Sequence, residues 1–267
     1  MASLHERLPR LQGFFACRPS PALAAYVQRF WWLQGDLAHV RDEQLLHPDG
    51  GSGLIFNFAD PLMFDGNRHS PGVVVAGPQL SSTRLHLAGQ VKLMGVRFLP
   101  GMGAAFLGAG LDELSGFRVA DEPRPAIARL VEQLAEVSCE DQQMLVERHL
   151  LACLKDTHQP RSPVQLLLTQ IAASEGRARL SDLLLAVPLG QRQLERLFRY
   201  QVGLTPKQFS RIQRVAKVRN ALRAGEPLLE TALDCGYSDQ AHFIHDFKRV
   251  VGMTPGQYRT RASKAVR

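Results

Sequence analysis

The chain has 267 residues, of which 45% are hydrophobic, enough to bury the cores of two ordinary domains. No stretch approaches the roughly 20 apolar residues of a membrane span, and the start, MASLHERLPR, has no apolar run to serve as a signal peptide, so we expect a cytoplasmic protein. The net charge of +7 is divided unevenly, because residues 1–160 hold 14 Lys and Arg against 17 Asp and Glu, whereas residues 161–267 hold 18 against 8. The basic half indicates a polyanionic partner, whether DNA, RNA or an anionic membrane surface.

The four cysteines are Cys17, Cys139, Cys153 and Cys235, and they stand far apart with no CxxC pair. This spacing favours reduced, buried thiols over a zinc site or a disulfide framework.

Short apolar runs separated by turn residues fill the first 120 residues. The runs stand at 29–33, 54–58, 73–75 and 91–98, with turns rich in Gly, Pro, Asn and Asp at 47–53, 65–67 and 71–72. We therefore expect residues 1–122 to form a small antiparallel β-domain. Apolar residues at helical spacing then predict a pair of amphipathic helices over 123–158, and a polar segment with two prolines places the interdomain linker at 159–163.

An internal repeat dominates the remaining residues, 164–262. Five residues recur at an offset of 49, namely Phe198, Gly203, Thr205, Pro206 and Phe209 as Phe247, Gly252, Thr254, Pro255 and Tyr258. Upstream of them, Leu184, Val187 and Leu189 correspond to Ala232, Cys235 and Tyr237 at an offset of 48. Each unit is a short apolar helix, a tight turn and a second helix with polar and basic groups on one side, which is the helix-turn-helix plan.

The connection between the two units predicts a connecting helix of about 19 residues, which spans roughly 28 Å. Thr205 can cap its start with Pro206 in the first helical position, and Gly225 and Pro227 mark its end. Recognition helices held apart in this way can enter successive major grooves on one face of DNA, which lie about 34 Å apart.

Three segments carry a resemblance to a known family: GQRQLERLFR at 190–199, GLTPKQF at 203–209 and CGYSDQAHFIHDFKR at 235–249. Over about 100 residues the chain resembles AraC-type transcription regulators of the AraC/XylS class. The resemblance implies seven helices with two helix-turn-helix motifs, and recognition helices at about 191–201 and 239–250. It also implies sequence-specific binding to double-stranded DNA, with RNA polymerase as a further partner if the protein activates transcription.

Carried onto this sequence, the resemblance implies two sets of DNA-contacting residues. The base-reading set is Arg192, Glu195 and Arg196 in the first unit, and Gln240, Ala241, His242, Ile244 and His245 in the second. The phosphate-contacting set is Arg211, Lys248 and Arg249. The side chains suit the task, because Arg reads guanine, Gln reads adenine and Glu accepts a hydrogen bond from cytosine.

The first unit departs from the family pattern. Pro188 stands where a Gly is usual in the turn, Gly190 stands where a Ser cap is common, and Leu184 replaces a small Ala. In the second unit, His245 occupies a place where Arg is frequent, which would make its DNA contact pH-dependent near neutrality. His242 and His245 have no third ligand nearby, so we expect no metal and no other cofactor there.

The segments 47–58 and 95–103 resemble the β-rich N-terminal domain of a subset of AraC-type proteins. The resemblance implies an α+β chain with a small cupin-like barrel, flanking helices that support a homodimer, and a small-molecule effector whose identity and ligand residues stay open. The aromatic residues that either line such a pocket or form sheet core are Trp31, Trp32, Phe56, Phe58 and Phe98. Arg97 lies within an apolar strand and needs a carboxylate, either Asp49, Asp60 or one supplied by a ligand.

Two other function classes compete with a sensor. An enzyme would need a metal on His39, His47, His69 and His86, whose spacing matches no ligand motif, so we expect no catalysis. A plain interaction module would use the β-domain and the helices over 123–158 only for dimerisation or for contact with another protein.

Overall fold

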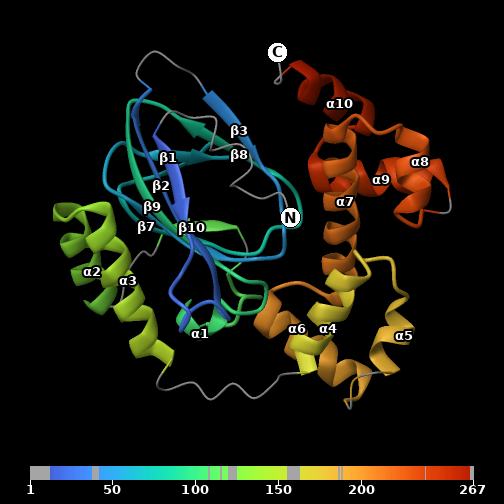
Figure 1. The fold of residues 1–267 in the computed structure, drawn as a ribbon, viewed down its shortest axis with the longest axis horizontal. Helices are drawn as coiled ribbons and strands as arrows, with labels where there is room; N and C mark the ends of the chain where they lie inside the picture. The colour runs from blue at the N-terminus through green and yellow to red at the C-terminus, as the bar shows by residue number, and fades with distance from the viewer. Residues whose placement is uncertain are drawn as a thin grey trace.

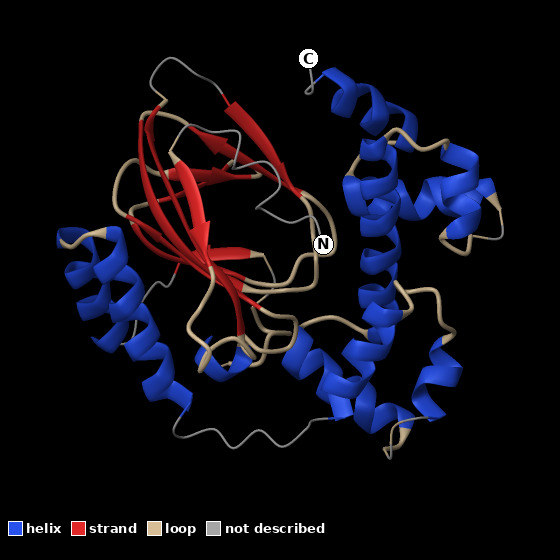
Figure 2. Ribbon diagram, viewed as in Figure 1, coloured by secondary structure: helices blue, strands red, loops and turns tan. Residues whose placement is uncertain are grey.

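A computed structural model shows an α+β chain with a β-rich N-terminal part and a helical C-terminal region (Figures 1 and 2). The structure describes residues 13–37, 42–107, 109–114, 116–119, 125–154, 163–185, 187, 189–237 and 239–264. His39, Pro188 and residues 159–162 of the predicted linker lie outside these ranges, and so does the side chain of Leu184.

The N-terminal part consists of two antiparallel sheets. The first has the order β1-β2-β9-β4-β7-β10, with β1 (Phe14–Cys17), β2 (Val27–Asp36), β4 (Gly53–Asn57), β7 (Gly72–Ala76), β9 (Gln90–Phe98) and β10 (Phe117–Val119). The second has the order β3-β8-β5-β6, with β3 (Asp42–Leu46), β5 (Leu62–Phe64), β6 (Asn67–His69) and β8 (Thr83–Leu87). The apolar runs predicted as strands correspond to β2, β4, β7 and β9. Within the described residues no strand of one sheet pairs with a strand of the other, so these residues show a two-sheet β-domain, and the barrel expected from the sequence stays a prediction.

Successive side chains of β2 enter different cores, because side chains alternate across a strand. Trp31 packs with residues of both sheets, whereas Trp32 faces a second core beneath α1 (Ala104–Leu107), α2 (Pro125–Glu136) and α3 (Cys139–Leu154). The indole nitrogen of Trp32 donates to Oε1 of Gln142 on α3 at 2.7 Å, and the amide of Gln142 donates to the Leu134 carbonyl. Phe56 and Phe98 are buried in the same core, so these aromatic residues are sheet core rather than pocket lining.

The C-terminal region is built around one long helix, α7 (Pro206–Ala224), which stands upright in Figure 1. Thr205 and Gln208 form a capping box at its start, and Gly225 ends it at φ 88°. The predicted connecting helix is therefore confirmed. The other helices are α4 (Pro163–Ala173), α5 (Leu180–Leu185), α6 (Gln191–Val202), α8 (Leu228–Asp234), α9 (Gln240–Val251) and α10 (Pro255–Lys264).

The sequence repeat becomes a repeated packing contact. Phe198 of α6 meets Phe209 of α7 edge to face, with ring centroids 6.0 Å apart. Their counterparts Phe247 of α9 and Tyr258 of α10 meet edge to face at 5.6 Å. All four side chains are buried in a single core that joins both units to α7. The residues that define the repeat therefore fix α6 and α9 in the same way, each against the helix that follows it.

Candidate nucleic-acid interface

The two predicted recognition helices, α6 and α9, begin differently. The carboxylate of Asp239 accepts a hydrogen bond from the His242 backbone N–H at 2.7 Å and caps α9. Gly190 precedes α6 and provides no side-chain cap. Because an N-cap side chain stabilises a helix start by about 1 kcal/mol, the first turn of α6 is held less firmly than that of α9.

A buried turn precedes α9. Cys235 and Tyr237 are buried on either side of Gly236, which adopts φ 77°. Burial raises the pKa of the Cys235 thiol to about 11 and is also the main cause of the raised pKa of Tyr237, over whose ring the Arg214 guanidinium lies at 5.1 Å. The Cys235 thiol and the Tyr237 hydroxyl therefore stay uncharged at neutral pH. Cys17, Cys139 and Cys153 are only half-buried, so the expectation of buried thiols is met by Cys235 alone, and no disulfide links these four described cysteines.

Most of the predicted base-reading side chains are exposed. Arg192, Arg196, Gln240, Ala241, His242 and His245 are exposed, whereas Glu195 and Ile244 are half-buried. Glu195 accepts a hydrogen bond from the Gln191 amide at 3.1 Å, and Ile244 packs against the helical core. Each helix thus buries one face and presents the opposite face with the predicted residues, which is the arrangement that groove binding needs.

Arg211 has a partner inside the protein. Its Nε lies 2.9 Å from Oδ1 of Asp246, whose side chain is only 3% exposed, while that of Arg211 is 18% exposed. His242, on the same helix as Asp246, approaches its other carboxylate oxygen at 3.5 Å. The ion pair with Arg211 therefore joins α7 to α9 at this acidic group. The phosphate contact of Arg211 stays a prediction, but the geometry gives this side chain a structural task as well. Lys248 and Arg249 are exposed by comparison.

The contrast between Arg211 and Lys248 yields a prediction. The variant Arg211→Ala leaves Asp246 buried without its main partner, and we expect the free energy of unfolding to fall by about 3 kcal/mol. The variant Lys248→Ala should leave stability within about 0.5 kcal/mol and, if Lys248 makes its predicted phosphate contact, reduce the salt slope of DNA binding by about 1. Urea unfolding and DNA titrations of both variants give the comparison. Equal stability of the two variants would contradict the structural role of Arg211.

The β-domain donates hydrogen bonds to the C-terminal end of both predicted recognition helices. The backbone N–H and the hydroxyl of Ser82 donate to the Val250 carbonyl of α9 at 2.8 and 3.0 Å. The backbone N–H of Leu111 donates to the Tyr200 carbonyl of α6 at 2.8 Å. Carbonyls in the last turn of a helix have no partner within the helix, so these bonds satisfy both helix ends from the same domain.

The loop between β3 and β4 makes further contacts with the helices. Asp49 forms an ion pair with Arg97 and accepts the Gly51 N–H, and its carbonyl accepts the amide of Gln213 on α7 at 3.2 Å. A Cβ at Gly50, which has φ 81°, would lie 2.3 Å from the ring of Phe209. Of the carboxylates considered as partners of Arg97, the structure therefore shows Asp49. The hydrogen bond from Gln213 connects this ion pair to the helical region.

His47 contacts the helical region beside this loop. Its Nδ1 lies 2.6 Å from the Ser82 hydroxyl, and its ring meets Tyr258 of α10 edge to face at 5.8 Å. The sequence indicated only a turn here, since side-chain contacts between segments far apart in the chain leave no local pattern.

Within the described ranges, no group of three His, Cys, Asp or Glu side chains is placed to hold a metal ion. In the same part of the chain, no helix has the length and apolar character needed to cross a membrane.

Two family models match the chain. Residues 185–261 match a family described as a helix-turn-helix domain, which spans α6 to α10 except for the end of α10. Residues 16–120 match a family described as a domain of unknown function, DUF6597, and contain nearly all of the two sheets.

Curated relatives match over part of the chain. The transcriptional activator RhaR of Enterobacter sp. is 29% identical over 155 residues, which cover 53% of this chain and 55% of that protein. RhaR of Klebsiella pneumoniae is 36% identical over 76 residues, 28% of this chain and 27% of that one. The transcriptional regulator MtrA of Neisseria gonorrhoeae is 34% identical over 95 residues, 35% and 32% of the two chains. The chain thus spans between about a quarter and just over half of these relatives.

Among solved structures, ToxT of Vibrio cholerae is similar along most of the chain. It covers 93% of this chain and 98% of its own at 10% identity, with a TM-score of 0.46. By the two family matches, the chain joins an N-terminal DUF6597 domain over residues 16–120 to a helix-turn-helix domain over residues 185–261.

Proposed function

We propose that the protein is a sequence-specific DNA-binding transcription regulator whose β-domain controls how two recognition helices are presented. The observation that carries the proposal is the repeated unit, in which α6 packs on α7 through Phe198 and Phe209 as α9 packs on α10 through Phe247 and Tyr258. The resemblance to AraC-type regulators and the basic excess of residues 161–267 support the same conclusion.

The dimensions of α7 suit one face of a DNA duplex. A helix of 19 residues spans roughly 28 Å at 1.5 Å per residue, close to the about 34 Å between successive major grooves. We infer that α6 and α9 each enter a groove through their N-terminal residues, with Arg192 and Arg196 from one helix and Gln240 and His245 from the other reading bases. Lys248 and Arg249 then contact phosphates beside the second groove.

We further propose that the β-domain modulates DNA binding through its hold on α6 and α9. An effector that favours one docking arrangement of the domains would change the spacing or angle of the two helices. Helices α2 and α3 lie on the side of the β-domain away from the DNA-binding helices (Figure 1), which leaves them open to a second copy of the chain. If the regulator activates transcription, RNA polymerase is its further partner. In this proposal the two sheets form the cupin-like barrel expected from the sequence.

Titration of the full-length chain with duplexes tests the DNA-binding proposal. We expect tighter binding to a selected DNA site than to a duplex RNA of the same sequence, because the major groove of A-form RNA is too narrow for a helix. Neutralisation of about six phosphates would give a slope near −5 for log K against log salt concentration. Equal affinity for the RNA duplex, or a slope near zero, would contradict the proposal.

The competing hypothesis, that the β-domain is a metal-dependent enzyme, can also be tested. We propose no catalytic role, and metal analysis of the purified protein checks this directly. Stoichiometric iron, zinc or manganese would support the enzyme instead.

A further inference from the structure

A cavity of about 790 Å³ lies between the β-domain and the helical region. Residues of the β-domain form one wall: Ala25, Leu99, Pro100 and Met102. Helices α4 and α7 form the other, with Leu168, Ala172 and Phe209 among the apolar residues. Ligand pockets in proteins range from about 300 to 1,000 Å³, so the cavity has the size of a small-molecule site.

The polar residues of the cavity are mostly uncharged. Gln165 and Thr169 of α4 and Gln213 and Asn220 of α7 line it together with the apolar residues. Amide side chains both donate and accept hydrogen bonds. Gln213 already donates to the Asp49 carbonyl at 3.2 Å, and Gln165 lies 3.8 Å from the Met102 sulfur, so both link the two walls.

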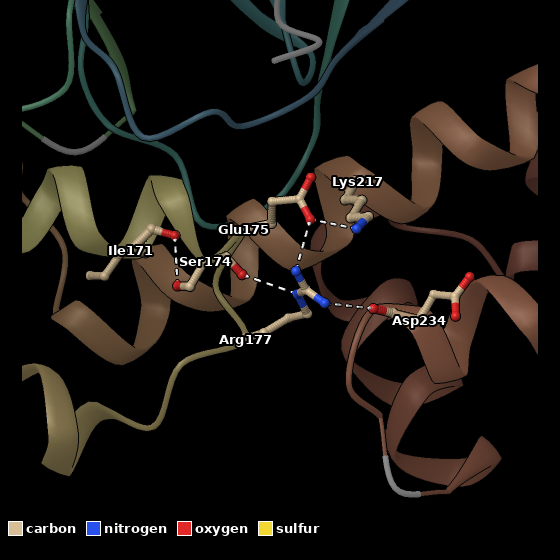
Figure 3. Close-up of polar contacts among 6 residues, drawn as sticks. All are labelled: Ile171, Ser174, Glu175, Arg177, Lys217 and Asp234. Carbon is tan, nitrogen blue, oxygen red and sulfur yellow. Dashed lines mark hydrogen bonds and ion pairs between the residues drawn. The ribbon is translucent and has the colours of Figure 1, made fainter.

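The charged residues at one end of the cavity neutralise each other. Glu175, which adopts φ 52° two residues after the end of α4, forms ion pairs with both Lys217 of α7 and Arg177 (Figure 3). Arg177 also donates to the Asp234 carbonyl at 3.5 Å (Figure 3). Glu226 adds another acidic group to the lining. Lys217 is the cation among the described lining residues, and its charge is paired with the carboxylate of Glu175. The site therefore offers little attraction to an anionic ligand.

We propose that this cavity binds an uncharged, mostly apolar small molecule that carries hydroxyl or carbonyl groups. The apolar walls bury its body, and the amides of Gln213 and Asn220 meet its polar groups. Because both domains supply walls, the bound molecule stabilises their docked arrangement. Its effect on DNA binding rests on the proposed function, whereas binding itself does not.

Binding is tested with the full-length chain and two fluorescent probes that share one framework. N-phenyl-1-naphthylamine is uncharged, and 8-anilino-1-naphthalenesulfonate is the same molecule with a sulfonate. We expect saturable binding of one N-phenyl-1-naphthylamine per chain and at least about tenfold weaker binding of the sulfonate. Non-saturable binding of the uncharged probe, or tighter binding of the sulfonate, would overturn the assignment of the ligand class.

Matched substitutions on α4 locate the site. Ala172 and Ala173 are both exposed on this helix, but only Ala172 lines the cavity. We expect Ala172→Trp to weaken the binding of N-phenyl-1-naphthylamine by at least about tenfold. Ala173→Trp should change this affinity by less than about twofold. Ala224→Trp fills the cavity from the exposed end of α7 and serves if Ala172→Trp does not fold. Unchanged affinity in the folded cavity variants would overturn the location. Since no DNA is present, failure of the DNA-binding proposal leaves this result intact.

Discussion

Replacing Arg192 and Arg196 together by alanine is expected to remove sequence discrimination at the base pairs that α6 reads. The two arginines stand at i and i+4 on the exposed face of the helix, so both can reach the same groove. Each bidentate contact with guanine contributes about 1–3 kcal/mol of discrimination, which gives about 2–6 kcal/mol for the pair if the contributions add. Affinities of the full-length double variant for a selected site and for a shuffled duplex measure the loss.

A double lysine variant provides the matched control for this experiment. Lysine keeps the positive charge but lacks the planar fork that binds guanine with two hydrogen bonds. We therefore expect Arg192→Lys with Arg196→Lys to retain affinity for shuffled DNA and to lose discrimination. If the lysines restore the full preference for the selected site, α6 contacts only phosphates and the base-reading assignment is wrong.

Replacing Asp49 by leucine is expected to destabilise the protein by about 3–5 kcal/mol, because it leaves a buried guanidinium without its carboxylate. Burial, with the neighbouring Arg29 as a second cause, lowers the pKa of Arg97 to about 10, so the group remains charged at neutral pH and needs its partner. Since domains are commonly stable by about 5–15 kcal/mol, the variant should lose a large part of its stability. Urea unfolding of the full chain gives the measurement.

A double variant separates the lost ion pair from other effects at this position. Asp49→Leu combined with Arg97→Met removes both charges, and we expect most of the lost stability to return, since apolar replacements of a buried pair are often neutral. If the double variant is no more stable than Asp49→Leu, the loop itself, and not the unpaired charge, accounts for the loss.

Local patterns in the sequence predict much of this fold. The apolar runs between turn residues predict β2, β4, β7 and β9, because alternating and buried strands need such runs. Thr205, Pro206 and Gly225 predict both ends of α7 through capping chemistry that acts within a few residues. The repeat predicts the paired units, and the charge in an apolar strand predicts a buried partner for Arg97.

Contacts between distant segments are less predictable. From the sequence, Arg211 was predicted only as a phosphate contact. Its ion pair with Asp246 could not be predicted, because Asp246 lies 35 residues further along the chain and only the packing of α9 on α7 brings the two side chains together. The hydrogen bonds from Ser82 and Leu111 to the ends of α9 and α6 use backbone groups that nearly every residue possesses, so they leave no mark in the sequence. The cavity between the β-domain and helices α4 and α7 likewise exists only because these distant segments pack against each other. Whether two sheets close into a barrel depends on pairing at strand edges, which composition does not encode.

Selection of binding sites from random DNA by the full-length chain tests the central claim most directly. The account predicts two short boxes about one helical turn apart, bound at least about a thousandfold more tightly than shuffled DNA near physiological salt. A single enriched box would show that α6, with its uncapped start, does not read bases. The absence of any enriched sequence would contradict the proposal that this protein is a sequence-specific regulator.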